Sequence, residues 1–157
     1  RYGHSCSMAL TFQTERLSEC LEEAKPLLAR HWQEIALNKD IIPLAPDYQR
    51  YFSLERDQKL CVCTARDEGR IVGYAVYVYD RQLHYPVLWA ESDIFYVDPD
   101  LRRPRVAHRL IVFMEEELKH RGVRVMHSRA KIEHPAAGRV LESMGHKPIE
   151  TVYAKVL

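Results

Sequence analysis

The stretch that decides the fold is FYVDPDLRRPRVAHRLIVFMEEELKHRGV, residues 95–123. It opens with an apolar run, passes through a short polar turn rich in arginine, and then repeats apolar residues at helical spacing. This order predicts the end of a strand, a tight turn and a long amphipathic helix. Gly122 marks the expected end of the helix, because glycine readily adopts the conformation that terminates helices. The residues of the apolar stripe are Ala107, Leu110, Ile111, Met114 and Leu118.

Before this stretch, the chain shows one strand pattern and two helical patterns. Residues 8–13 alternate apolar and polar side chains, which predicts a short first strand. From Leu17 onward apolar residues follow helical spacing, although Pro26 predicts a kink or two abutting helices. A Pro-Asp pair then opens a second short helix, roughly residues 47–56.

Further runs rich in β-branched and aromatic residues precede the turn. Two of them flank RDEGR (66–70), a five-residue connection that contains glycine and therefore indicates a hairpin. The second run covers residues 71–79, and a third covers 88–97. Together they predict antiparallel strands arranged as a meander.

The residues after the long helix complete the sheet. Residues 123–132 predict a strand, and a strand–helix–strand unit of this length implies parallel pairing with 88–97. A short helix is expected after Pro135, and residues 147–157 predict a terminal strand or half of a hairpin. The fold class is therefore α+β, with one mixed, mostly antiparallel central sheet of 6–7 strands and helices on both faces.

Length and composition fit one ordinary globular domain. The chain has 157 residues, 46% apolar and 29% charged, with a net charge of +1 and a pI near 7.9. This balance argues against nucleic-acid or membrane partners, and the apolar runs are shorter than the roughly 20 residues of a membrane span. We expect a single domain over residues 8–157, with residues 1–7 as a tag or tail.

Cysteine usage favours a reducing compartment. Cys61 and Cys63 have one residue between them, whereas paired zinc ligands usually have two or more, and no second pair follows. Buried free thiols without a metal are therefore expected. The sequence also shows no secretory signal pattern. The expected location is cytoplasmic.

The turn at residues 102–108 is a candidate anion site. A helix N-terminus presents unpaired N–H groups and a partial positive charge. Arg102, Arg103 and Arg105 can add charge-assisted hydrogen bonds to a phosphate. The plainer interpretation is a basic, solvated turn that only caps the helix. The turn by itself leaves both interpretations open.

A longer motif around this turn is informative. VDP (97–99) is followed by RRPRVA (102–107), which resembles Gln/Arg-x-x-Gly-x-Gly/Ala, the phosphate-cradling motif set after a V-x-P strand end in the GNAT N-acetyltransferase superfamily. Arg102 and Ala107 match the first and last positions of that motif. Arg105 stands where the middle glycine belongs.

Two further motifs are similar to those of the same superfamily. LESMGH (141–146) is similar to Y-E-K-L-G-F, and HPAA (134–137) is similar to N-x-x-A, with His134 in place of the asparagine. The order of the predicted elements also agrees with that fold. The resemblance covers roughly residues 8–157 and is strongest over 88–146.

The resemblance implies a GNAT fold and an enzyme that moves an acetyl group from the cosubstrate acetyl-CoA to a primary amine of a small molecule or protein, by direct attack in a ternary complex. Arg105 keeps its backbone N–H, whereas Pro104 has none but presets a helix start. We therefore expect a rebuilt cradle that uses guanidinium charge. The alternative is a non-catalytic GNAT-fold module that binds CoA or a partner. The residues expected at the cofactor are Tyr96, Val97, Arg102, Arg103, Arg105, Val106, Ala107, His108, His134 and Ala137.

The chemistry is expected at the end of the central strand. By the resemblance, backbone N–H groups around Tyr96 and Val97, near a bulge, polarise the thioester carbonyl. Two carboxylates in an otherwise apolar strand are unusual, and alternation places Glu91, Asp93 and Phe95 on one face. The expected base is Asp93, because it is nearer the expected bulge, with Glu91 second. The alternative is that one or both are rim residues paired with arginines.

The acid and the acceptor site are less defined. The superfamily's usual tyrosine falls at Leu141, which cannot donate a proton, so His134 or Tyr96 can substitute. His134 can equally bind CoA or cap the helix. Acceptor specificity is expected from the first helices and from the connection at residues 80–86. On that connection His84 and Tyr85 are expected to bind the acceptor, or merely to cover the sheet edge. A homodimer is compatible with the open edge of a terminal strand.

Overall fold

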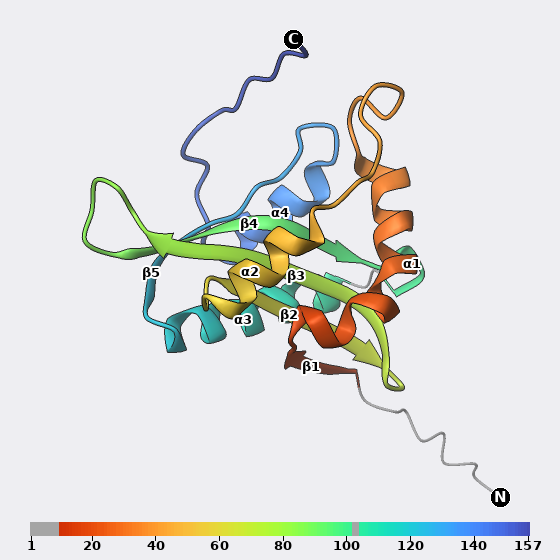
Figure 1. Cartoon of the computed structure of the whole chain (residues 1–157), viewed down its shortest axis with the longest axis horizontal. Coiled ribbons are helices and arrows are strands. Elements are labelled where there is room, and N and C mark those ends of the chain that lie inside the picture. Colours follow the sequence, from red (N-terminus) through yellow and green to blue (C-terminus); the bar gives the residue numbers. More distant parts are fainter. Residues whose placement is uncertain (1–9, 102–103) are drawn as a thin grey trace, which may run out of the picture.

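The computed structural model describes residues 10–101 and 104–157, which form an α+β fold with helices on both sides of one sheet (Figure 1). In these ranges the sheet has five strands in the order β1-β2-β3-β4-β5. The strands are β1 (Thr11–Thr14), β2 (Leu60–Asp67), β3 (Arg70–Arg81), β4 (Leu88–Val97) and β5 (Val123–His127). The helices are α1 (Leu17–Ile35), α2 (Tyr48–Arg56), α3 (Pro104–His120) and α4 (Pro135–Ser143), with a short 3₁₀ turn η1 (Pro99–Leu101).

The predicted antiparallel meander is confirmed. β2, β3 and β4 pair antiparallel in sequence, and β1 pairs antiparallel with β2. The β2–β3 turn is tighter than the predicted five-residue connection, because Asp67 pairs with Arg70 and only Glu68 and Gly69 lie between them. These two residues have φ of 49° and 79°. Positive φ at both positions gives the turn the twist that two-residue hairpins favour.

The predicted parallel pairing is also confirmed, but over a shorter length. The register runs from Leu88 opposite Val123 to Glu91 opposite His127. β5 ends at His127, whereas the sequence predicts a strand to residue 132. In the part of the chain that the structure describes, the second half of β4 therefore has a neighbouring strand on the β3 side but none on the β5 side.

The prediction of 6–7 strands is wrong, because the described chain after α4 adds no strand to the sheet. Residues 147–157 are exposed, and Figure 1 shows them running away from the sheet. Pro148 lacks the N–H that a ladder requires. Apolar residues also fall on both faces of an alternating pattern, with Ile149 on one face and Val152 on the other. Such a segment has no single apolar face to bury.

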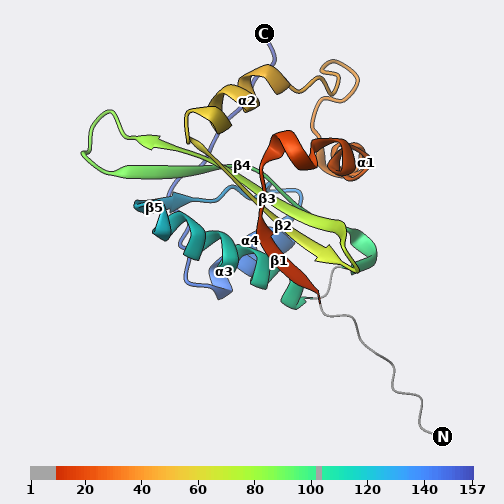
Figure 2. The same cartoon turned by 60° about the horizontal axis from the view of Figure 1, so that its bottom comes forward.

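Helices cover both faces of the sheet, as predicted. Figure 2 shows α1 and α2 on one side and α3 and α4 on the other. α1 continues through Pro26 as one helix and changes direction along its length (Figure 1), so the expected interruption is a bend. α2 starts after Asp47, whose carboxylate accepts the backbone N–H of Arg50 at 3.0 Å.

The sheet separates two apolar layers, and alternate residues of its central strands serve each layer. The layer beneath α3 includes Leu110, Met114, Cys61, Cys63 and Tyr77. The layer beneath α1 and α2 includes Leu17, Leu21, Val62 and Val76. Burial on both faces explains why the central parts of β2 and β3 are mostly apolar, without the polar face of an exposed sheet.

Replacing Leu110 by alanine should lower the free energy of unfolding by about 2–5 kcal/mol, because this fully buried side chain would leave a cavity beneath the sheet. The matched control is Val112→Ala on the same helix, where the side chain is 39% exposed and the expected change is about 0.5 kcal/mol. Urea unfolding measures both variants. Equal losses would contradict the assignment of the α3 core face.

Candidate active site

A β-bulge interrupts β4 near its centre. Tyr77 of β3 lies opposite Ser92, but its neighbour Val76 lies opposite Ile94, so Asp93 is an extra residue on β4. The sequence analysis expected the bulge nearer the end of the strand. The structure places it at the residue expected to act as the base.

The bulge corrects the predicted faces of β4. Alternation predicts Glu91, Asp93 and Phe95 on one face, and this prediction is wrong for Phe95. Phe95 packs in the layer beneath α3, whereas the Asp93 side chain reaches Tyr51 of α2 on the opposite face. The extra residue shifts the alternation by one position, so Ile94 packs on the same side as Asp93.

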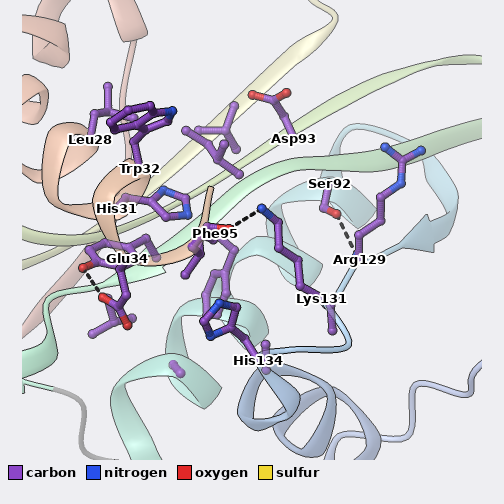
Figure 3. Close-up of a pocket in the computed structure, with 18 of the residues that line it drawn as sticks. Leu28, His31, Trp32, Glu34, Ser92, Asp93, Phe95, Arg129, Lys131 and His134 are labelled. Atoms are coloured by element: carbon purple, nitrogen blue, oxygen red, sulfur yellow. Dashed lines mark hydrogen bonds between the residues drawn. The ribbon is translucent and has the colours of Figure 1, made fainter. Parts of the chain in front are cut away.

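A cleft of about 1690 Å³ opens where β4 and β5 part. Ser92 holds the junction, because its hydroxyl accepts the backbone N–H of Arg129 at 2.9 Å (Figure 3). Beyond this point, the side of β4 that faces the cleft has no neighbouring strand in the described residues. Backbone groups in this position can bind a ligand instead of a strand.

The two walls of the cleft differ in charge. The wall formed by α3, α4 and the connection after β5 carries arginines and a lysine, together with two histidines and the carboxylate of Glu133. Among the described residues, the wall formed by α1, α2 and the sheet contributes no arginine or lysine to the cleft, and its carboxylates are Glu34 and Asp93. The first wall therefore suits an anion such as a phosphate. Its arginines and lysine are Arg105, Arg109, Arg129, Lys131 and Arg139.

Asp93 is held by a tyrosine hydroxyl. Tyr51 donates a hydrogen bond to Oδ2 of Asp93. Burial, reinforced by this carboxylate, raises the pKa of the Tyr51 hydroxyl, so Tyr51 remains a neutral donor. Asp93 itself is exposed and lines the cleft. The bulge thus presents an oriented carboxylate to the cleft.

Glu91, the second base candidate, lies outside the described lining of the cleft. Its carboxylate lies 2.9 Å from Nδ1 of His127 and 3.3 Å from the guanidinium of Arg129. These contacts match the alternative interpretation of a rim carboxylate paired with an arginine. They also tie the last paired residues of β4 and β5 together.

Tyr96 lies in a buried cluster at the base of the α1 wall. Its ring stacks on His31 with centroids 4.4 Å apart, and its hydroxyl donates to Glu34 at 2.6 Å. Nδ1 of His31 lies 2.7 Å from the hydroxyl of Tyr74. Burial raises the pKa of the Tyr74 hydroxyl, which keeps it protonated beside the imidazole. The cluster fixes α1 against β3 and β4.

The connection from β5 to α4 forms part of the facing wall. His134 precedes α4, makes no side-chain cap hydrogen bond, and points into the cleft in Figure 3. Ala137 in the first turn of α4 also lines the cleft. Lys131 reaches across to the carbonyl oxygen of Ile35 at 2.6 Å, where α1 ends (Figure 3). This bond links the two walls. Leu141 lies outside the described lining.

The start of α3 opens onto the cleft, as expected for a phosphate site. Arg105, Ala107 and His108 line the cleft, and Arg105 is exposed. Val106 packs into the layer beneath the sheet and is 7% exposed. Because the Val106 side chain is buried, only its backbone can contact a ligand in the cleft.

The remaining predicted residues lie elsewhere. Arg102 and Arg103 lie outside the described residues. His84 and Tyr85 are in the β3–β4 connection and are not part of the described cleft lining. Tyr85 stacks on Trp89 with ring centroids 5.7 Å apart. This contact packs Tyr85 on β4, which is paired with β3 and β5 at Trp89, so it does not cover an edge strand of the sheet.

Sequence reasoning assigned acceptor specificity to the first helices but identified none of the cleft residues of α1 and α2. Tyr51, Trp32 and Glu34 fit an ordinary amphipathic helix, and nothing local shows that they face the end of β4. The available signal was His31, a polar residue on the apolar stripe of a helix. It is 6% exposed and bonded to the sheet.

Comparison with known proteins identifies the family. Residues 20–146 match the family model described as Acetyltransferase (GNAT) family. The chain belongs to this GNAT family. The resemblance drawn from the motifs is thereby confirmed, and the five-stranded sheet with its parted strands is a GNAT fold.

Solved structures similar to this GNAT chain include N-acetyltransferases. One is a ribosomal-protein-alanine N-acetyltransferase from Brucella melitensis biovar Abortus 2308, which is 19% identical and has a TM-score of 0.72. The match covers 95% of this chain and 99% of the Brucella chain. An aminoglycoside acetyltransferase from an uncultured soil metagenomic sample is 20% identical, with a TM-score of 0.75 and coverage of 96% and 99%. An aminoglycoside N-acetyltransferase in complex with CoA is 20% identical, with a TM-score of 0.68 and coverage of 95% of each chain. These identities show a shared fold. A comparison with curated proteins found no match.

Other features of the described chain bear on its class. Within residues 10–101 and 104–157, no helix has the length and apolar character needed to cross a membrane. The same ranges contain no group of three or more His, Cys, Asp and Glu side chains that could hold a metal ion. Cys20, Cys61 and Cys63 are buried free thiols, as expected.

The raised pKa of Tyr51 predicts that its hydroxyl stays protonated at a pH where ordinary tyrosines ionise. At about pH 11, where an ordinary tyrosine is ionised, native wild type and Tyr51→Phe should show equal tyrosinate absorbance, because Tyr51 stays protonated. The stability that the Tyr51 hydroxyl contributes is present below its unfolded pKa of about 10 and is lost as pH rises above it. In urea-unfolded protein the variant should lack one tyrosinate. A native variant lacking one tyrosinate already at about pH 10 would contradict the contact with Asp93.

Proposed function

We propose that this GNAT chain transfers an acetyl group from acetyl-CoA to a primary amine of a small molecule or protein, by direct attack in a ternary complex. The observation that carries the proposal is the parting of β4 and β5, which sets the Asp93 carboxylate beside the exposed side of β4. The cationic wall across the cleft supports the same function, because CoA carries several phosphate charges.

The phosphates of CoA are proposed to bind where α3 begins. Helix N-termini attract anions through unpaired N–H groups and the helix dipole. Arg105 adds an exposed guanidinium at this end, and Arg139 of α4 adds another on the same wall. Arg102 and Arg103 adjoin this site in the sequence. One similar solved structure is in complex with CoA, which supports the proposal.

The thioester is proposed to lie along the side of β4 that faces the cleft. Backbone N–H groups around Tyr96 and Val97 can polarise its carbonyl as negative charge develops on the oxygen. The amine nitrogen then attacks the carbonyl carbon, so a C–N bond forms and the C–S bond breaks. The electron pair of that bond leaves on the CoA sulfur.

Asp93 is proposed as the base, acting directly or through a water molecule. An amine with a pKa of about 10 is almost fully protonated near neutral pH, so it must lose a proton before attack. Asp93 is exposed to the cleft and oriented by Tyr51. His134, on the opposite wall, is proposed to protonate the thiolate, and its side chain makes no cap hydrogen bond.

A non-catalytic GNAT module that binds CoA or a partner is the second candidate. Two departures favour it: Leu141 stands in place of the family's tyrosine, and Arg105 in place of a glycine. Release of free CoA distinguishes the candidates. A cytoplasmic location is also proposed and is supported by the buried free thiols. The outer edge of β5, unpaired in the described residues, is compatible with a homodimer.

Acetyl-CoA at 100 times its Kd should stabilise the wild-type protein by roughly 2.7 kcal/mol, measured by thermal melting. Arg105→Ala should weaken binding about tenfold or more, because one charge-assisted hydrogen bond to phosphate is lost. Arg124→Ala is the matched control, since Arg124 is exposed on β5 and lies outside the described lining of the cleft. The absence of stabilisation in wild type would overturn the proposed function. Equal weakening in both variants would move the phosphate site away from α3.

Asp93→Asn should lower kcat by about 10²–10⁴-fold, the usual contribution of a general base, while the acetyl-CoA melting shift is unchanged. The asparagine oxygen can still accept the Tyr51 hydroxyl, so the fold of the bulge is preserved. Asp100→Asn is the control, because this carboxylate is 84% exposed on η1. Release of CoA thiol with an amine panel measures kcat. Full activity in the Asp93 variant would exclude Asp93 as the base.

A further inference from the structure

The acceptor side of the cleft is strongly apolar. With the cationic wall assigned to CoA under the proposed function, the acceptor must lie against α1, α2 and the connection between them. Figure 3 shows Leu28 and Trp32 of α1 on this side. Pro43, Leu44 and Ala45 of the connection also line it. Leu44 is 43% exposed in the unliganded chain. A ligand covering these side chains removes apolar surface from water.

Carboxylates on this wall are few and far apart. The two in the described lining are Asp93, at the bulge, and Glu34, near the end of α1. Figure 3 shows them on opposite sides of the pocket. Glu34 already accepts the hydroxyl of Tyr96, whereas Asp93 is exposed beside the gap between the strands. One ammonium group can therefore be matched at the position where attack takes place.

A ligand with several charges or many hydroxyls fits this wall poorly. Each additional ammonium would need its own carboxylate, and each sugar hydroxyl would need a hydrogen-bond partner. The leucine, proline and alanine side chains of this wall offer neither. Of its polar side chains, Tyr51 is already bonded to Asp93 and His31 to Tyr74. Removing those groups from water without a partner costs binding free energy, so the lining selects against polycations and sugar phosphates.

We infer that the acceptor is a small amine with a single positive charge and an apolar aryl or alkyl body. The ammonium lies at Asp93, and the body lies against Leu28, Trp32 and Leu44. This inference rests on the proposed function and adds the acceptor class to it. It separates this chain from similar structures named for aminoglycosides and for a ribosomal protein.

The test compares amines of different chemistry in the CoA-release assay. The panel is 2-phenylethylamine, spermidine, glucosamine 6-phosphate and a short peptide beginning with alanine. The kcat/KM for 2-phenylethylamine should exceed each of the others by about tenfold or more, the range for apolar contacts in a specificity pocket. Equal or higher kcat/KM for spermidine, the sugar phosphate or the peptide would overturn the inference and leave the acetyltransferase proposal standing.

A pair of variants tests the wall itself. Leu44→Asp places a charge in the lining and should lower kcat/KM for 2-phenylethylamine about tenfold, with a smaller loss or a gain for spermidine. Ile42→Asp is the matched control, because Ile42 is 53% exposed in the same connection and lies outside the described lining. It should leave both values within about twofold. Equal effects of the two variants on 2-phenylethylamine would overturn the inference.

Binding separates this inference from a failure of catalysis. Saturation-transfer NMR on protein saturated with CoA detects 2-phenylethylamine at the wall without any turnover. Transfer that Leu44→Asp removes, with no CoA released from any amine, would show that the wall binds such an amine but would reject the transferase, and with it the role of that amine as acceptor. The absence of transfer to 2-phenylethylamine, together with transfer to spermidine, would overturn the inference whatever the activity.

Discussion

The parting of β4 from β5 is the constraint on which the rest of the structure depends. A parallel ladder continues as long as each strand offers its backbone groups to the other. Here the ladder stops after Glu91 and His127. The Ser92 hydroxyl then takes the backbone N–H of Arg129, and the bulge at Asp93 adds local twist. The chain after β5 is thereby released toward α4, and the gap becomes the cleft. The sheet loses pairing at this point, and both apolar layers, which pack against the paired strands, supply the stability that keeps the gap open.

The two walls of the cleft differ in charge and polarity because different elements build them. The α3–α4 wall is made of a helix N-terminus and a connection rich in basic residues, so it attracts anions. The other wall is the side of α1 and α2 that faces the sheet, so its lining is an extension of the apolar core. Lys131 joins the two walls, because its ammonium group donates to the carbonyl oxygen of Ile35 at the end of α1. The positive ammonium group and the negative end of the helix dipole stabilise each other there. A charged donor and a mainly apolar acceptor can thus approach β4 from opposite sides.

Much of the fold could be predicted from local periodicity. β4 covers residues 88–97 as expected, and α3 and the meander follow from spacing within short windows. The resemblance implied a bulge near Tyr96 and Val97, but its true position at Asp93 could not be predicted, because a difference in register between two strands leaves no mark in either sequence alone. The predicted strand at 147–157 was wrong because β propensity is not enough when apolar residues fall on both faces. Asp93 was predicted from the carboxylates in an otherwise apolar strand and Arg105 from the turn motif, and both line the cleft. Tyr51 was missed because its contact with Asp93 joins residues 42 positions apart.

Arg105 lies at the start of α3, where the phosphates are proposed to bind, and it is the departure that bears most on the proposed function. The backbone conformation explains why the helix tolerates an arginine there. Glycine is required where φ is positive or where a Cβ would collide with a ligand. In the described chain the non-glycine residues with positive φ are Asn38, Gln58 and Glu68, so Arg105 needs no such conformation. Only the approach of a phosphate remains as a reason for glycine. An exposed, flexible guanidinium can move aside from the backbone and bind the same phosphate from a greater distance. Because contacts between exposed charges are screened by salt, a cradle of this kind should bind its phosphates with a stronger dependence on ionic strength than one built from backbone N–H groups alone.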